Sequence, residues 1–464
     1  MSEKLVTVKI NNEEIKVKEG ELLIKLLKKE HMEVPYFCYH DALGADGNCR
    51  MCMVEIEGKK RPQIACDTPV KEGMVVKTNS DMIKKVRKNI LELELINHPI
   101  DCPVCDQAGE CRLQDYYMDY GVYEGRIDKA KKVHLQKHLD IGNNVILDQE
   151  RCVLCQRCVR FTDNITKTHE LGVIGRGNHS RISTMPGKKL NNSYAMNIVD
   201  LCPVGALTNK DFRFKQRVWF LKSTPAICHG CAKGCNIYID HNKEKYKDDT
   251  IYRIRARVNH DINGYFICDE GRMSYKELEI NRQYNALLNS KTIDFGDVSK
   301  EFEKIIKETK GDILILADAN LYLEELEAIK EFAKTLNAAV CSPLKIYIDE
   351  SFGDDWLKSK NRAANAKGIQ KLNIPQTYED IEKLELVINF NHPAFKNFLT
   401  PKSISFQTHK EFEADLILPI AAFSETEGTL INEDNITQFS QRAIHSKQKI
   451  PNIIEWIEML KDKK

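Results

Sequence analysis

Apolar and polar residues alternate at the start of the chain, as they do along a half-buried β-strand. Every second position from Val6 to Ile10 is apolar, and the alternation resumes at Ile15 and Val17 after an Asn-Asn pair. Asparagine tolerates the backbone angles of tight turns, so the segment predicts a β-hairpin. Leucines at helical spacing within residues 22–27 predict a helix across that hairpin, which indicates a β-grasp-like domain.

A second periodic segment covers residues 81–97, where apolar residues recur at helical spacing. One stripe carries Ile83, Val86, Ile90 and Leu93, and a Ser-Asp pair at the start supplies a cap. We therefore expect an amphipathic helix here, followed by a loop that begins at a His-Pro pair.

Residues 281–464 show a different pattern, in which short apolar runs are followed by amphipathic stretches. The segments that carry it are GDILILADANLYLEELEAIKEF, LELVINFNH and EADLILPIAAFSETEGTLINED. Buried strands that alternate with helices indicate a parallel sheet covered by helices. The expected fold class is therefore multidomain, with α+β domains in front and an α/β domain behind.

The balance of charges argues against nucleic acid and acidic membranes as partners. The 69 Lys and Arg residues nearly balance 68 Asp and Glu residues, so no global field attracts nucleic acid or an acidic membrane. No run approaches the ~18 apolar residues of a membrane helix, and the N-terminus lacks the features of a secretory signal. We expect a protein of the reducing cytosol with no nucleic-acid partner.

Cysteines supply the candidate chemistry. All sixteen except Cys341 lie between residues 38 and 268, and in a reducing compartment they favour metal or redox chemistry over disulfides. Cys341 has no partner in the sequence and is expected to be a buried structural thiol. The other fifteen form four groups with His98: Cys38, Cys49, Cys52 and Cys66; His98, Cys102, Cys105 and Cys111; Cys152, Cys155, Cys158 and Cys202; Cys228, Cys231, Cys235 and Cys268.

The first group has the spacing C-x10-C-x2-C-x13-C, with Gly44 and Gly47 in the long gap. Glycines let backbone N–H groups approach sulfur closely. Four thiolates suit a [2Fe–2S] cluster, although the first gap is longer than in plant-type ferredoxins. A four-cysteine zinc site is the alternative, although zinc sites more often show two C-x2-C pairs.

The second group lies in HPIDCPVCDQAGEC and contains the one histidine that we expect to be a cluster ligand. A lone histidine at a helix end is more often a cap or a surface residue, but three nearby cysteines favour ligation by His98. Imidazole in place of thiolate predicts a higher reduction potential. His134 and His138, four apart on a possible helix, are expected at the surface, and His229 is expected to support ligands without being one.

The third and fourth groups both suggest [4Fe–4S] clusters. RCVLCQRCVRF with a distant Cys-Pro pair has a ferredoxin-like spacing. Arg151, Arg157 and Arg160 either offset the charge of its thiolates or form a solvated basic face. The fourth group, C-x2-C-x3-C-x32-C, fits a [4Fe–4S] cluster, and a zinc ribbon is the alternative.

These motifs together resemble the large iron–sulfur subunit of the peripheral arm of respiratory complex I, the G subunit of bacterial NADH:quinone oxidoreductase. The resemblance covers residues 1 to about 280 and rests on the motifs quoted above with CPVGAL, GVIGRG and VNHDINGYFICDEGR. It implies one [2Fe–2S] cluster on the first group, [4Fe–4S] clusters on the second and third, and an extra, structural cluster on the fourth. That makes two to three [4Fe–4S] clusters in all.

The resemblance also implies a domain plan. The expected domains are a [2Fe–2S] ferredoxin-like β-grasp domain (1–78), a helical [4Fe–4S] domain with one histidine and three cysteines as ligands (79–140), a four-cysteine [4Fe–4S] domain (141–221), a second four-cysteine [4Fe–4S] subdomain (222–280) and a shortened, non-catalytic molybdopterin-oxidoreductase-like α/β domain (281–464).

The function implied is electron transfer within the NADH dehydrogenase module of complex I, with no catalytic residue in this chain. Electrons would arrive from a flavin-bearing NADH-oxidising subunit and leave through downstream iron–sulfur subunits towards quinone. The chain would lie in the cytoplasm, in the peripheral arm on the cytoplasmic face of the inner membrane, and meet the membrane only through this respiratory-chain translocase. Alternatives are the equivalent subunit of an NAD-linked hydrogenase or formate dehydrogenase, and a zinc-binding scaffold.

Overall fold

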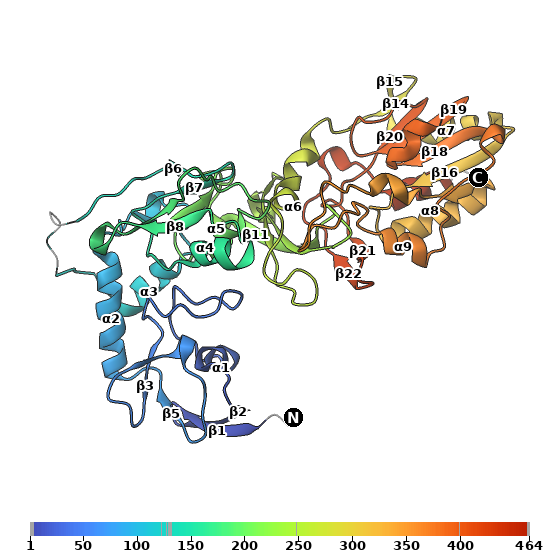
Figure 1. Cartoon of the computed structure of the whole chain (residues 1–464). Helices are drawn as coiled ribbons and strands as arrows, with labels where there is room; N and C mark the ends of the chain where they lie inside the picture. The colour runs from blue at the N-terminus through green and yellow to red at the C-terminus, as the bar shows by residue number, and fades with distance from the viewer. Residues whose placement is uncertain are drawn as a thin grey trace. The chain divides into compact units, whose positions relative to one another are not determined.

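The computed structural model describes residues 4–121, 123–126, 128, 132–246, 248–398 and 400–461. The chain divides into two compact units, Met1–Trp219 and Phe220–Lys464 (Figure 1). In the described ranges, no helix is both long enough and apolar enough to cross a membrane.

The first unit begins with the predicted hairpin and helix. Asn11 and Asn12 form the turn with φ values of 48° and 80°. The hairpin strands are antiparallel, whereas the strands Leu5–Ile10 and Val75–Lys77 pair in parallel, and this mixed pairing confirms the β-grasp-like prediction. The sheet order is β2-β1-β5-β3-β4, and the elements are β1 (Leu5–Ile10), β2 (Glu13–Lys18), α1 (Leu23–Lys29), β3 (Met53–Ile56), β4 (Gln63–Ile64) and β5 (Val75–Lys77).

The predicted amphipathic helix is α2 (Asp81–Leu95), whose cap is the Ser80 side chain. Its buried face is not the expected stripe. Leu93 is 66% exposed, because burial follows positions spaced by four instead: Ile83, Arg87 and Leu91. Arg87 belongs to this face because its guanidinium donates to the Met53 carbonyl at 2.8 Å.

The remainder of the first unit consists of short elements joined by loops. Residues 132–138 contain no helix, so the possible helix at His134 and His138 was a wrong expectation, although both side chains are exposed. The sheets are β10-β7-β6 and the hairpin β8-β9. The elements are α3 (Arg112–Tyr120), β6 (Leu139–Asp140), β7 (Val145–Leu147), α4 (Arg157–Arg160), a π-helical turn (Phe161–Ile165), β8 (Leu171–Ile174), β9 (Arg181–Thr184), α5 (Asn197–Leu201) and β10 (Leu207–Asn209).

The second unit starts with a three-stranded antiparallel sheet in the order β11-β12-β13. A short helix follows the sheet, and a separate hairpin, β21-β22, comes from late in the chain. The bounds are β11 (Leu221–Ile227), β12 (Asn236–Asn242), β13 (Ile251–Ala256), α6 (Asp269–Met273), β21 (Gly428–Ile431) and β22 (Thr437–Ser440).

The rest of the second unit is built on a seven-stranded sheet in the order β15-β14-β20-β19-β18-β16-β17. The last five strands of that order are parallel, as predicted from the apolar runs. The strands are β14 (Ala286–Leu288), β15 (Lys291–Ile293), β16 (Asp312–Ala317), β17 (Ala339–Cys341), β18 (Leu384–Phe390), β19 (Lys402–Gln407) and β20 (Leu416–Pro419). The helices are α7 (Phe295–Glu308), α8 (Leu323–Leu336), α9 (Ala366–Lys371) and α10 (Ile453–Lys461).

Candidate metal centres

The four cysteines of the first group come together beside β3, and all of them are buried. The Cys38 thiol lies within hydrogen-bonding reach of Cys49 and Cys66, and hydrogen bonds from these two thiols lower its pKa. Backbone N–H groups also point at sulfur: that of Phe37 lies 3.4 Å from the Cys49 Sγ, and that of Gly47 bonds to Cys38. This is the donor-rich cage expected around an iron–sulfur cluster.

The candidate ligands of the second group line one pocket of about 440 Å³. His98 follows the end of α2, Cys102 begins a 3-10 turn and Cys111 precedes α3. The His98 imidazole donates to the Arg151 backbone, and burial lowers its pKa to about 4. Its Nδ1 is buried without a hydrogen-bond partner. A neutral imidazole with a free lone pair is the form that binds metal, so these residues fit the expected cluster.

A glycine from the third group's segment forms part of the same pocket. A Cβ on Gly205 would lie 2.4 Å from the Cys105 Sγ, a distance that no side chain tolerates. No sequence motif indicated a role for this residue, although it stands in the CPVGA run that supplies Cys202. The glycine therefore leaves room for the second group's sulfur.

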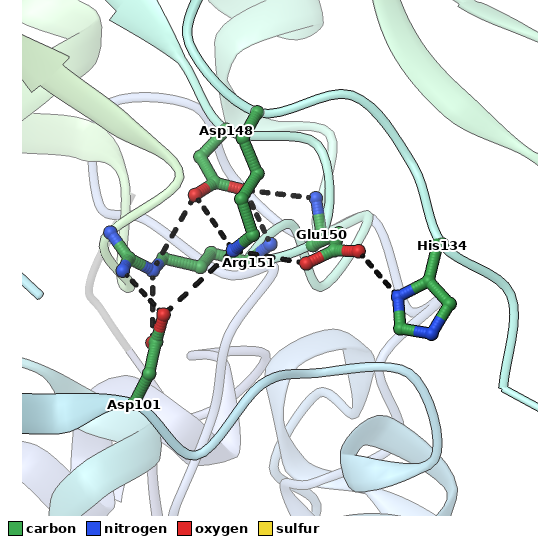
Figure 2. Close-up of polar contacts among 6 residues, drawn as sticks. Asp101, His134, Asp148, Glu150 and Arg151 are labelled. Atoms are coloured by element: carbon green, nitrogen blue, oxygen red, sulfur yellow. Dashed lines mark hydrogen bonds and ion pairs between the residues drawn. The ribbon is translucent and has the colours of Figure 1, made fainter. Parts of the chain in front are cut away.

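A partly buried ion-pair network borders this pocket (Figure 2). Arg151 is 4% exposed, and its Nε and Nη2 donate to the two oxygens of Asp101 at 3.2 and 2.7 Å. Asp148 lies 3.6 Å from the Arg151 Nε, and Lys137 binds both acids and Glu150. Burial raises the pKa of Cys105, and the positive charge of Arg151 opposes that rise. Arg151 thus offsets thiolate charge rather than forming a solvated face.

The third group assembles where a loop leads into α4 and α5 ends. Burial raises the pKa of all four thiols, and those of Cys152 and Cys158 are raised further by other cysteines of the group. The Leu154 N–H lies 3.4 Å from the Cys152 Sγ, and the backbone groups of three residues bond to Cys202. This group too is a buried thiol cage with backbone donors.

Two arginines join the first and third groups. Arg157 is 3% exposed and donates to the carbonyls of Tyr39 at 2.5 Å and Leu201 at 2.9 Å. Arg160 donates to the Cys38 carbonyl. Neither residue belongs to a solvated basic face.

Cysteines of the first three groups also share a single apolar cluster. Its cysteines are Cys38, Cys49, Cys111 and Cys155, with Cys152 and Cys202 packed against it. Burial raises the pKa of Cys155 to about 12, and the thiols of Cys202 and Cys38 add to the rise. Burial likewise raises the pKa of Cys111 to about 12, with additions from Cys105 and Cys202. The third group therefore adjoins both of the others.

The fourth group lies in the second unit. A Cβ on Gly271 would lie 3.0 Å from the Cys228 Sγ and 3.3 Å from the Cys268 Sγ. The Gly271 N–H donates to the Cys268 Sγ at 3.3 Å, where this thiol caps α6. Burial raises the pKa of Cys235, and the other three thiols add to the rise. His229 stacks on an aromatic ring instead of joining the thiols.

Nowhere in the described ranges do three His, Cys, Asp or Glu side chains form a site for a single metal ion. In a [4Fe–4S] cluster each thiolate binds a different iron atom, so its ligands stand further apart than those of one ion.

Comparison with known protein families assigns most of the cysteine-rich half. Residues 3–81 match a 2Fe-2S iron-sulfur cluster binding domain, and residues 87–126 match the NADH-ubiquinone oxidoreductase-G iron-sulfur binding region. Residues 142–208 match the ferredoxin-like domain of NADH-quinone oxidoreductase subunit 3, and residues 221–279 match the molybdopterin oxidoreductase Fe4S4 domain. The chain thus contains a [2Fe–2S] domain followed by [4Fe–4S] domains.

Curated relatives have the same character. The NADH-ubiquinone oxidoreductase 75 kDa subunit of Reclinomonas americana is 37% identical over 351 residues, which are 75% of this chain and 49% of the relative. The G subunit of NADH-quinone oxidoreductase from Rickettsia felis is 40% identical over 339 residues, 72% of this chain and 50% of the relative. The chain spans about half the length of these relatives.

One solved structure overlaps part of the chain. A chain in the crystal structure of NAD+-reducing [NiFe]-hydrogenase in the H2-reduced state is 28% identical, with a TM-score of 0.42, covering 46% of this chain and 91% of that one.

The family matches and the curated relatives confirm the resemblance drawn from the cysteine motifs. The chain therefore belongs to the family of large iron–sulfur subunits of NADH:quinone oxidoreductase, known as the G or 75 kDa subunits.

Proposed function

We propose that this chain carries electrons through three iron–sulfur clusters in the NADH dehydrogenase module of a complex I-type NADH:quinone oxidoreductase. The observation that carries the proposal is the apolar cluster in which cysteines of the first three groups pack together. Clusters held there would be close neighbours, as outer-sphere electron transfer requires, and their burial would help to set their reduction potentials.

The ligand sets are proposed as the sequence grouped them. The first four cysteines would hold a [2Fe–2S] cluster, and the second and third groups would each hold a [4Fe–4S] cluster. Such clusters supply reversible one-electron chemistry when bound. The chain's own residues orient the ligands, donate N–H groups to sulfur and exclude water, so no side chain acts as acid, base or nucleophile.

The third group is proposed as the middle of the relay. Its Cys155 adjoins Cys38 of the first group, and its Cys202 adjoins Cys111 of the second. Electrons would therefore pass from the first group to the third and then to the second, or in reverse. The fourth group belongs to the second unit's own apolar core, which supports a structural cluster outside this relay.

The domain plan is proposed with boundaries near residues 78, 140, 221 and 280. The four family matches, at 3–81, 87–126, 142–208 and 221–279, support these boundaries. The seven-stranded sheet that follows supports a separate α/β domain.

The partners would be a flavin-bearing NADH-oxidising subunit and downstream iron–sulfur subunits that lead to quinone. The relatives are named as subunits of NADH-ubiquinone and NADH-quinone oxidoreductase, and these names support electron flow from NADH towards a quinone. The chain would then lie on the cytoplasmic face of the inner membrane, in the peripheral arm of the complex.

Iron and acid-labile sulfide counted in anaerobically purified chain would test the proposal. Four clusters require about fourteen iron and about fourteen sulfide atoms per chain. Zinc bound without sulfide would overturn the proposal and favour a scaffold. Electron paramagnetic resonance during reduction by NADH, with the flavin subunit present, would then test whether the clusters receive electrons.

A further inference from the structure

The parallel strands of the second unit reverse their order at one point. In chain order the five strands are arranged 2-1-3-4-5, because β17 lies on one side of β16 and β18 lies on the other. Figure 1 shows β16, β18 and β20 in this sheet with α8 and α9 nearby. In open parallel sheets, ligands bind beyond the carboxyl ends of the strands where the order reverses.

A pocket of about 680 Å³ lies at that edge. Its lining includes the residues that directly follow four parallel strands: Asp318, Asn391, Thr408 and Ile420. The Asn391 side chain donates to the Asp318 carboxylate at 3.1 Å, which joins the ends of β16 and β18 at the point of reversal.

Two buried carboxyl groups line the pocket, and the lining contains no Lys or Arg. Asp318 is 4% exposed and Glu325 is 7% exposed. In the described part of the chain, neither forms an ion pair within 4.0 Å. Burial raises the pKa of Asp318 to about 6 and that of Glu325 to about 7. Buried carboxylates without a counter-charge are costly, so this lining repels anions and would be stabilised by a cation.

The two carboxylates differ in how many hydrogen bonds they already accept. Asp318 already accepts hydrogen bonds from Tyr347, Asn320 and Asn391. Glu325 accepts one from the Tyr322 N–H through its Oε2, at 3.0 Å. Its Oε1 has no donor in the described ranges, so Glu325 is the acid with an oxygen available to a ligand.

Aromatic rings form another part of the lining. His229 stacks on Phe423 with ring centroids 4.7 Å apart and meets Tyr322 edge-on at 5.1 Å. The Nε2 atoms of His229 and His409, both residues of the lining, are buried without hydrogen-bond partners. Such rings suit a flat, positively charged group, and unpaired imidazole nitrogens provide further hydrogen-bonding sites.

We propose that this pocket binds a small, flat organic cation of the amidine or guanidine class, held by Glu325 and the aromatic rings. This inference concerns the second unit, in which the α/β domain supplies most of the lining and the cysteine-bearing subdomain supplies His229, and it is independent of the electron relay.

Benzamidine, benzamide and benzoate test the proposal, because they share a ring and differ in charge. Binding to the full chain is measured by saturation-transfer NMR and isothermal titration calorimetry at pH 8. Benzamidine is expected to bind at least about tenfold more tightly than benzamide, because a hydrogen bond between charged groups contributes about 1.5–3 kcal/mol. Benzoate is expected not to bind.

Glu325→Gln locates the site, since glutamine can still accept from the Tyr322 N–H. It is expected to weaken benzamidine binding about tenfold. Glu331→Gln, on the exposed face of the same helix, is the matched control and should leave binding unchanged. Phe423→Leu removes the stacking ring and provides a second variant if Glu325→Gln does not fold. No binding by benzamidine, equal binding by all three probes, or unchanged affinity in the variant that folds would overturn the proposal.

Discussion

Arg151 and Asp101 form a half-buried, two-point ion pair that links the segments of the second and third groups (Figure 2). Asp101 immediately precedes Cys102, and Arg151 immediately precedes Cys152. The backbone of Arg151 also accepts a hydrogen bond from the His98 imidazole. One residue thus orients the histidine, brings positive charge beside Cys105 and joins the two loops.

The first prediction concerns the sign of this charge. Arg151→Gln should lower the reduction potential of the His98 cluster, because a positive charge near the thiolates favours the reduced form. Asp101→Asn should raise that potential, because it removes the negative partner and leaves the guanidinium uncompensated. Redox titration followed by electron paramagnetic resonance measures both shifts.

Potential shifts of opposite sign in the two variants would distinguish an electrostatic role of the ion pair from disruption of the structure. If both variants shifted the potential the same way, or both lost the cluster, the pair would be only a structural brace. Arg126→Gln is the control, since Arg126 pairs with Glu92 and its side chain is 76% exposed. It should leave every potential unchanged.

His98 gives a second prediction. His98→Cys should retain a [4Fe–4S] cluster with a lower potential, because thiolate adds a negative charge that imidazole lacks. His134→Cys is the control, since that histidine is exposed and pairs with Glu150. Unchanged spectra and potential in His98→Cys would show that His98 is not a ligand.

Local features of this fold could be predicted from the sequence, because they depend on neighbouring residues. The hairpin turn at Asn11-Asn12 and the helix capped by Ser80 are examples. Three members of each ligand group stand close together in the sequence, and this spacing led to the predicted groups. That each group holds its cluster stays a prediction, which iron and sulfide counts would test.

Features that depend on contacts between distant segments could not be predicted. The partner of Arg151 lies 50 residues away in the chain, and Arg87 belongs to a buried face because it reaches the Met53 carbonyl. The pocket beside Asp318 exists because four strand ends meet at one edge of the sheet. Each feature follows from tertiary packing. The periodicity of apolar residues, which is 3.6 for a helix and 2 for a strand, does not indicate which distant segments meet.

A third prediction uses the core of the α/β domain. Trp456 of α10 is fully buried, and its indole N–H donates to the Pro419 carbonyl at 2.7 Å. Trp456→Ala should lower the free energy of unfolding of this domain by about 3–5 kcal/mol, from the lost apolar contacts and the cavity left behind. Chemical denaturation followed by circular dichroism measures the loss, and Met459→Ala, at a more exposed position of the same helix, should cost far less.

The last prediction concerns the close approach of Gly205 to Cys105. A Cβ at this position would lie 2.4 Å from sulfur and 3.1 Å from the Gln107 Cβ, so Gly205→Ala must displace the Cys105 loop. We expect loss of the His98 cluster, seen as about four fewer iron atoms per chain and the disappearance of its paramagnetic signal. Gly296→Ala, where a Cβ meets nothing within 4 Å, is the control and should keep the full iron content. A Gly205→Ala chain with unchanged iron and an unchanged signal would mean that Cys105 is not held where a cluster needs it.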